Sequence, residues 1–188
     1  MRIISGTFKG KKILTPKDNK TRPLKDLTKE SIFNIIRHSN KFKIDFTNSY
    51  ILDLFSGVGS FGIECLSRGV KKVVFIENYS GVLPLLKKNL FSLEKIQNYE
   101  IIEKNIYNEN IFLELIDKFD IIFLDPPYKD KNLENLLNEI KDQKILNKNG
   151  IIILHRHKNE TDSFPSSFQI IEQKAYGISK IIFLSYLN

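Results

Sequence analysis

The feature that most constrains the fold is an alternation, from residue 50 onward, of short apolar runs with longer amphipathic stretches. Short runs bounded by turn residues are typical of interior strands, and apolar positions three or four apart are typical of helices. We expect strands at 50–55, 72–77, 100–104, 120–124 and 150–155, and helices at 60–68, 81–92, 109–118 and 131–146. This β-α alternation predicts an α/β fold with a mostly parallel sheet covered by helices on both faces.

The C-terminal part departs from that alternation. Residues 168–174 and 180–186 read as two strands joined by a turn at Gly177, with no helix between them. Strands joined by a tight turn pair in antiparallel fashion. The complete prediction is therefore a seven-stranded, mostly parallel Rossmann-like sheet that ends in an antiparallel hairpin.

The first 45 residues have a different character, and we treat them as a separate extension. Residues 2–14 predict a β-hairpin around Thr7–Gly10, and the Pro-, Lys- and Asn-rich stretch 15–25 predicts an exposed loop. Asp26 is then the expected N-cap of a helix with its apolar positions at Leu27, Ile32, Ile35 and Ile36. We divide the chain into a basic N-terminal hairpin, loop and helix (1–45) and a larger α/β domain (46–188).

The positive charge of the protein is concentrated in this extension. Residues 1–30 hold nine basic and three acidic side chains, so they carry +6 of the net charge of +7. Such an asymmetry indicates a surface for a polyanion, although a merely solvated basic segment has a similar composition. The candidate polyanion-contacting residues are Arg2, Lys9, Lys11, Lys12 and Arg22.

Composition excludes several classes of protein. At 188 residues and 41% hydrophobic residues the chain can bury an ordinary globular core. It has no apolar run near the roughly 20 residues that span a bilayer and no signal-peptide core, so we expect a cytoplasmic protein without membrane contact. One Cys and three scattered His exclude a disulfide framework and predict no metal site.

A glycine-rich turn follows the first strand of the α/β domain. Gly57, Gly59 and Gly62 form a G-x-G-x-x-G pattern, and Glu77 ends the next strand 20 residues after Gly57. This layout is typical of an adenosine-cofactor site, where the backbone approaches the ligand and an acid binds the ribose hydroxyls. Asp53 argues against NAD, because its carboxylate would repel a pyrophosphate but attract a cationic ligand.

The sequence Asp125-Pro126-Pro127-Tyr128 ends the strand 120–124. An Asp-capped strand exit is the simplest interpretation, but two prolines and an aromatic ring form a rigid corner suited to hold a flat, polar group. The carboxyl ends of parallel strands meet at one edge of a sheet. We therefore expect one cavity to collect this corner with Asp53, Gly57, Glu77 and Asn105.

Together these motifs resemble the class I S-adenosylmethionine-dependent methyltransferases that modify exocyclic amino groups, whose pattern is [DNS]-P-P-[YFW]. The resemblance implies that Asp125 and the Pro126 carbonyl accept hydrogen bonds from the target amine and that Tyr128 stacks on the base. It further implies S-adenosyl-L-methionine as the cofactor, bound by Asp53, Phe55, Gly57, Gly59, Glu77, Asn78, Asn105 and Ile106. Asp53 would lie near the amino group of the cofactor, Glu77 at the ribose, and the last three residues near the adenine.

These residue types suit amine methylation. The lone pair of an exocyclic amine is delocalised into the ring, and two acceptors on its N–H bonds favour a pyramidal nitrogen. A carboxylate also stabilises the positive charge that develops on nitrogen in the transition state. An aromatic ring stacked on the base contributes about 1–3 kcal/mol. A base paired in a duplex must be flipped out to enter such a site.

The segments 2–14, 21–23, 29–35, 53–69 and 120–128 are similar to one bacterial family, the RsmD-type guanine-N2 methyltransferases of small-subunit (16S) ribosomal RNA. The resemblance implies ribosomal RNA, in the small subunit or an assembly intermediate, as the partner. The chain departs from the family at Leu27 and Lys29, where arginines are usual, and at 154–157, where relatives tend to carry an acid. We interpret His155 and His157 as solvated or RNA-facing residues on one strand face.

Other interpretations remain open at this point. The same DPPY chemistry serves an adenine-N6 DNA methyltransferase, although the chain is small for a separate sequence-reading domain. A non-catalytic RNA-binding or assembly protein and an NAD oxidoreductase are further alternatives, distinguishable by whether the protein binds S-adenosylmethionine or NADH. Cys65 sits inside a predicted helix and is expected in the core, which argues against methylation of a pyrimidine carbon. We expect a monomer.

Overall fold

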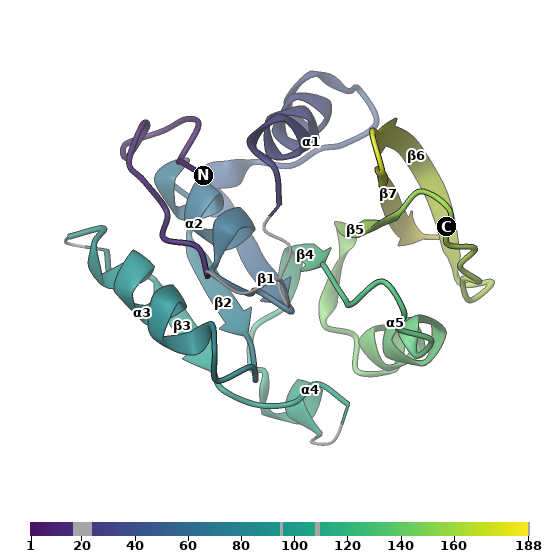
Figure 1. Cartoon of the computed structure of the whole chain (residues 1–188). Coiled ribbons are helices and arrows are strands. Elements are labelled where there is room, and N and C mark those ends of the chain that lie inside the picture. Colours follow the sequence, from purple (N-terminus) through teal and green to yellow (C-terminus); the bar gives the residue numbers. More distant parts are fainter. Residues whose placement is uncertain (17–23, 95, 108–109, 188) are drawn as a thin grey trace.

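The computed structural model describes residues 1–16, 24–94, 96–107 and 110–187. A seven-stranded sheet has the strand order β3-β2-β1-β4-β5-β7-β6 (Figure 1). All strand pairs are parallel except β5–β7 and β6–β7. The strands are β1 (Tyr50–Leu54), β2 (Lys72–Ile76), β3 (Tyr99–Ile102), β4 (Phe119–Leu124), β5 (Leu146–His157), β6 (Phe168–Tyr176) and β7 (Ser179–Tyr186). The predicted fold class is therefore confirmed.

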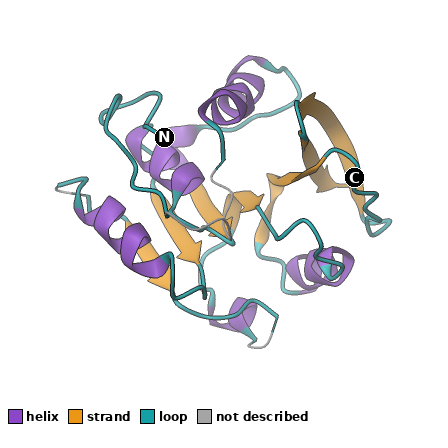
Figure 2. Ribbon diagram, viewed as in Figure 1, coloured by secondary structure: helices purple, strands orange, loops and turns teal. Residues whose placement is uncertain are grey.

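Helices cover both faces of the sheet (Figure 2). They are α1 (Asp26–His38), the 3₁₀ turn η1 (Phe46–Asn48), α2 (Ser60–Ser67), α3 (Leu83–Phe91), α4 (Ile111–Glu114) and α5 (Leu133–Asp142). One hydrophobic cluster joins α1, α2 and α3 to the sheet, and a second joins α4 and α5 to it. Successive strand residues alternate between these two clusters, as the period of two in a strand requires. In the part of the chain that the structure describes, no helix is long and apolar enough to cross a membrane.

Two predicted helices are shorter than expected. The segment 109–118 contains only the single turn α4, and α5 ends at Asp142 rather than near residue 146. Lys144 adopts a left-handed backbone (φ 53°), a conformation that commonly terminates a helix. The buried side chains of Ile145 and Leu146 then lead directly into β5, which is correspondingly long.

The start of α1 also differs from the prediction. The helix begins at Asp26, but Lys25 is the N-cap residue and no side chain caps the helix. Asp26 instead accepts a long hydrogen bond from the Arg2 backbone N–H (3.4 Å). Leu27, predicted on the apolar face, is 78% exposed.

The N-terminal segment folds back on itself, but its predicted strands are wrong. An isolated bridge joins Arg2 and Lys12, and backbone hydrogen bonds from Ile3 to Lys11 (2.9 Å) and from Gly10 to Ile3 (2.8 Å) flank it. No regular strand forms, because the backbone N–H groups of the residues between these arms bind α2 instead. The Ile4 and Ser5 N–H groups donate to the Glu64 carboxylate (2.8 and 3.0 Å). Gly6 has a left-handed backbone (φ +82°) and lies against the C-terminal end of α2. An added Cβ there would lie 1.8 Å from the Ser67 carbonyl oxygen, so the position requires glycine. Helix α2 thus takes up donors that a β-hairpin would have paired internally.

A buried ion pair completes this attachment. Lys29 is fully buried, and its ammonium donates to the Arg2 carbonyl (2.9 Å) and lies 3.6 Å from Glu64. Burial lowers the pKa of Lys29, and the nearby Glu64 carboxylate opposes that shift. Lys29 therefore belongs to the interior and not to the exposed basic surface.

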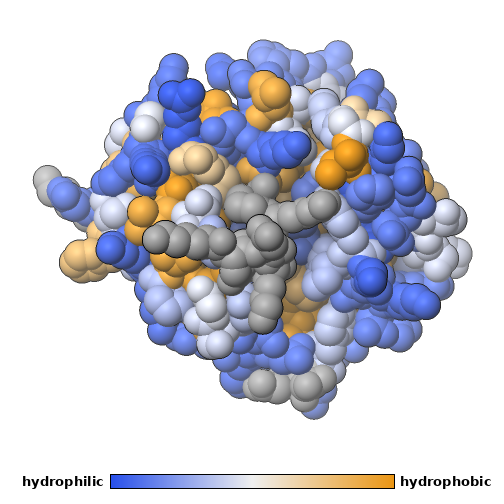
Figure 3. Space-filling model, in the orientation of Figure 1, coloured by the Kyte–Doolittle hydropathy of each residue, from blue (hydrophilic) through white to orange (hydrophobic). Residues whose placement is uncertain are grey.

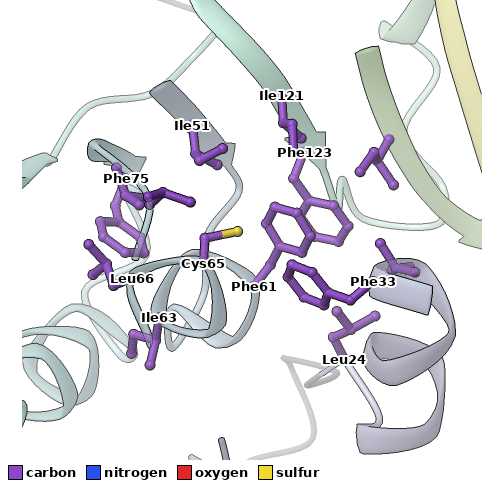
Figure 4. Close-up of a cluster of buried hydrophobic side chains, with 14 of the residues drawn as sticks. Leu24, Phe33, Ile51, Phe61, Ile63, Cys65, Leu66, Phe75, Ile121 and Phe123 are labelled. Atoms are coloured by element: carbon purple, nitrogen blue, oxygen red, sulfur yellow. The ribbon is translucent and has the colours of Figure 1, made fainter. Parts of the chain in front are cut away.

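An aromatic stack connects the extension to the sheet. Phe61 of α2 lies between Phe33 of α1 (ring centroids 5.4 Å apart) and Phe123 of β4 (4.1 Å), as Figure 4 shows. Cys65 points into the same cluster and is buried, as predicted. Because Phe61 and Phe123 also line a cavity at the sheet edge, the extension supports the floor of that cavity.

Candidate active site

A cavity of about 490 Å³ lies at the carboxyl ends of β1, β2 and β4. Small-molecule sites usually have volumes of about 300–1,000 Å³. Its walls are Leu24, Asp53, Phe55, Ser56, Gly57, Val58, Ser60, Phe61, Glu77, Asn78, Tyr79, Phe123, Asp125, Pro126, Pro127 and Tyr128. The glycine loop and the DPPY corner therefore share one cavity, as the sequence predicted. The face of the molecule in Figure 3 is mainly hydrophilic at its rim, with scattered hydrophobic patches toward the middle.

Glu77 shapes the glycine loop. One carboxylate oxygen accepts from the Gly57 N–H (2.7 Å), and the other accepts from the N–H groups of Asn78 and Tyr79 (2.9 and 2.8 Å). Gly59 has φ +82°, and a Cβ there would lie 2.6 Å from a methyl group of Leu86. The loop conformation therefore depends both on glycine and on an acid from the neighbouring strand.

Phe55 leaves β1 with a left-handed backbone (φ 57°). A bulky residue in this region is unusual and stores strain, which proteins concentrate at functional sites. Its half-buried ring lines the cavity and lies 5.8 Å from the ring of Tyr107. The turn thus brings the backbone that follows β1 to the cavity wall.

Asp53 lies at the base of the cavity and is 1% exposed. Its carboxylate accepts one hydrogen bond, from the Gly62 N–H at 2.9 Å. Burial raises the pKa of Asp53 well above its ordinary value, the Gly62 hydrogen bond opposes that shift, and the Asp125 and Glu77 carboxylates add to it. A cation placed in the cavity would stabilise the ionised form of this residue.

The charge of the cavity is opposite to that of the whole protein. Asp53, Glu77 and Asp125 supply three carboxyl groups, and the described residues that line the cavity include no Lys or Arg. Because like charges repel strongly in a partly buried site, a pyrophosphate-containing ligand would be disfavoured here. A ligand with ammonium and sulfonium groups fits this electrostatic environment.

The DPPY loop, defined as residues 125–130, carries the second half of the site. The Asp125 carboxylate is hydrogen-bonded to the Nδ1 atom of His155 at 2.8 Å. His155 is 5% exposed, so the prediction that it is solvated or RNA-facing is wrong. The register between β4 and β5 pairs Leu124 with Leu154, and the next residues of both strands are therefore neighbours. The sequence carries no signal for this contact, because the register between two strands is set by the tertiary structure.

Arg156 is a site residue that sequence reasoning missed. Its buried guanidinium donates to the carbonyls of Pro127 (3.0 Å) and Asp130 (3.1 Å) and to the Asp162 carboxylate (2.9 Å). Arginine provides several donors in a rigid plane, so one side chain can hold two carbonyls of a loop. Arg156 thereby fixes the backbone of the DPPY loop against β5.

Aromatic contacts hold the outer end of the loop. The Tyr128 ring meets the rings of His155 and His157 edge-on, with centroids 6.2 and 5.3 Å apart. The Tyr107 hydroxyl donates to Asp130 (2.7 Å). Burial raises the pKa of Tyr107 most, and this hydrogen bond raises it further. His157 is half-buried, and it shares the strand face of His155 as predicted.

Some predicted site residues, among them Gly59, do not line the cavity. Asn105 uses its side chain to accept from the Tyr107 N–H (3.0 Å), Ile106 is buried in the core, and neither lines the cavity. Arg2, Lys9 and Lys12 are exposed on the N-terminal segment, whereas Lys11 is half-buried and donates to the Ser92 carbonyl. Arg22 lies outside the described residues.

Comparisons with known proteins identify the family. Residues 1–185 match the family described as Conserved hypothetical protein 95. The chain belongs to this family. Its relatives include the Haemophilus influenzae ribosomal RNA small subunit methyltransferase D, 31% identical over 95% of this chain and 90% of the relative. A Bacillus subtilis protein named as an rRNA methyltransferase, YlbH, is 32% identical over 96% of both chains.

A solved structure has the same fold. An Escherichia coli protein named as a methyltransferase, yhhF, superimposes with a TM-score of 0.81 at 26% identity, covering 99% of this chain and 97% of its own. The resemblance to RsmD-type methyltransferases is therefore confirmed. The fold, with its parallel strands and antiparallel C-terminal hairpin, is that of the class I methyltransferases.

Proposed function

We propose that this methyltransferase transfers the methyl group of S-adenosyl-L-methionine to the exocyclic N2 of a guanine in small-subunit ribosomal RNA. The observation that carries the proposal is the acidic cavity, in which Asp53, Glu77 and the glycine loop face the DPPY loop with its Asp125, without a lining Lys or Arg among the described residues. The chemistry of this donor set fits a cationic adenosine cofactor. The names of the relatives support ribosomal RNA as the substrate class.

The cofactor half of the site uses groups that are already in place. When bound, S-adenosylmethionine supplies an activated methyl group on a positively charged sulfur. Asp53 holds the amino group of its methionine portion, and the Glu77 carboxylate, kept in place by three backbone N–H groups, accepts from the ribose hydroxyls. Phe55, Gly57 and Asn78 complete the wall. Gly59, Asn105 and Ile106 do not line the cavity and act by supporting the residues that do.

The substrate half holds the amine and the base. Asp125 and the Pro126 carbonyl each accept a hydrogen bond from one N–H of the amine, and Tyr128 stacks on the base. The Asp125 carboxylate also stabilises the positive charge that develops on nitrogen, which favours the transition state over the bound substrate. Because His155 and Arg156 already hold the loop, little conformational freedom is lost when the base binds.

The basic N-terminal segment provides the polyanion contact. Arg2, Lys9, Lys11, Lys12 and Arg22 bind phosphates of the ribosomal RNA, in the small subunit or an assembly intermediate, and the enzyme acts as a monomer. Each phosphate that these residues neutralise releases roughly one counterion from the RNA, so the affinity for RNA falls steeply as the salt concentration rises. They position the RNA and leave the choice of base to the cavity.

The test is transfer of tritiated methyl groups to small ribosomal subunits from cells that lack this protein. The wild-type protein is expected to form N2-methylguanosine, and D125A to abolish transfer while still binding S-adenosylhomocysteine. D142N, which removes a carboxylate from the exposed end of α5, is the matched control. N6-methyladenosine formed in DNA would replace the proposal with an adenine methyltransferase. Absence of transfer to any RNA would refute it.

A further inference from the structure

Among the described residues, the side chain of His155 forms its hydrogen bond with Asp125. In the register of β4 and β5, Leu124 pairs with Leu154, so Asp125, the first residue after β4, lies beside His155, which is still paired with Ile181 of β7. The Nδ1–Oδ1 distance is 2.8 Å, with 6% of the His155 side chain and 21% of the Asp125 side chain exposed. The histidine thus contacts the carboxylate from the protein interior, while the carboxylate also lines the cavity.

The chemistry of the contact sets its direction. An ionised carboxylate can only accept, so the Nδ1 atom of His155 carries the proton and donates it. The Nε2 atom is buried without a partner among the described residues. An orphaned buried polar atom destabilises the fold, and a leucine would avoid that cost. The compensating gain of histidine at this position is its hydrogen bond to Asp125.

This contact gives the two carboxylate oxygens of Asp125 different environments. Oδ1 is hydrogen-bonded to His155, and within the described part of the chain Oδ2 has no hydrogen-bond partner. We propose that His155 is a positioning residue: it holds the Asp125 carboxylate in one rotamer, so that Oδ2 is the oxygen that accepts from the substrate amine. This role rests on the proposed function, because it concerns the alignment of that amine.

The neighbouring residue makes the same loop rigid in a complementary way. Arg156 holds the backbone of the DPPY loop through the Pro127 and Asp130 carbonyls, but it does not contact the Asp125 side chain. Backbone restraint alone leaves the carboxylate free to rotate about its Cβ–Cγ bond. His155 removes that remaining rotation. A correctly oriented reacting group stabilises the transition state much more than it stabilises the bound substrate, so the effect should be on kcat.

The test compares H155N with H155L. The amide nitrogen of Asn occupies nearly the position of Nδ1 and keeps the donor, whereas Leu fills the volume without one. With tritiated S-adenosylmethionine and small ribosomal subunits from cells lacking this protein, H155L is expected to lower kcat about 10–100-fold. KM for the subunits and the Kd of S-adenosylhomocysteine should stay within about twofold of wild type, and H155N should recover most of kcat. H38L makes the same replacement at an exposed histidine and should be unchanged.

The outcomes separate cleanly. An H155L enzyme as fast as wild type, or an H155N enzyme as slow as H155L, would overturn the positioning role while leaving the proposed function intact. A wild-type protein that transfers no methyl group would overturn the proposed function and this role with it. If H155L no longer unfolds cooperatively, H155Q takes its place in the test. The amide of Gln lies at the Nε2 position and puts no donor at the Nδ1 position, so H155Q should have the same low kcat that is expected of H155L.

Discussion

The buried Asp53 allows a prediction that links stability to cofactor binding. The change is D53N, which keeps an oxygen to accept from the Gly62 N–H (2.9 Å) and removes a charge from a side chain that is 1% exposed. Burying an ionised carboxylate costs several kcal/mol, and a hydrogen bond to a charged group returns about 1.5–3 kcal/mol. The remaining cost, on the order of 1–2 kcal/mol, should be relieved in D53N.

The pH dependence of this gain has a definite sign. Because the pKa of Asp53 is raised in the folded protein, its contribution to stability is complete below the pKa of the unfolded chain and is lost as pH rises through the folded pKa. The Tm difference between D53N and wild type should therefore be small near pH 4–5 and widen toward pH 8. For a chain of this length 1–2 kcal/mol corresponds to about 2–8 °C.

Cofactor affinity should move in the opposite direction. S-adenosylhomocysteine keeps the ammonium group that Asp53 is proposed to hold, so D53N should weaken its binding by about 10–100-fold in calorimetry. D142N removes the same charge from an exposed position and should change neither property. A D53N protein that is less stable than wild type at pH 8, or that binds S-adenosylhomocysteine normally, would refute the reasoning.

Three further substitutions test how the fold supports the site. G62A puts a Cβ 2.3 Å from the Phe75 ring and should lower the free energy of unfolding by about 1–3 kcal/mol in urea denaturation, unless the ring can move aside. R156M removes both donors that hold the DPPY loop and should lower kcat about tenfold at unchanged Kd for S-adenosylhomocysteine; unchanged kcat would mean that the loop is rigid without it. E64Q removes the buried charge that Lys29 and Arg68 share, and it replaces one of the two oxygens that accept from Ile4 and Ser5. It should cost about 3–5 kcal/mol in the same denaturation assay, so a loss below about 1 kcal/mol would argue against this buried carboxylate as the anchor of the N-terminal segment.

The sequence alone determined the architecture and the two halves of the site. Hydrophobic periodicity separates strands from helices because it reflects local geometry, and the five parallel strands all lie where that periodicity placed them to within a few residues. Parallel strands bring their carboxyl ends to one edge, so the glycine loop, Glu77 and Asp125 could be assigned to one cavity without coordinates.

Only the tertiary structure decided which polar side chains are buried and what they contact. His155 and Arg156 are ordinary charged or titratable residues in the sequence, and only strand register places them against a loop about 30 residues away. Lys29 counts as a surface cation by composition but is a buried partner of Glu64. Local patterns depend on neighbours within a few residues, whereas the burial of a polar group depends on partners that distant parts of the chain provide.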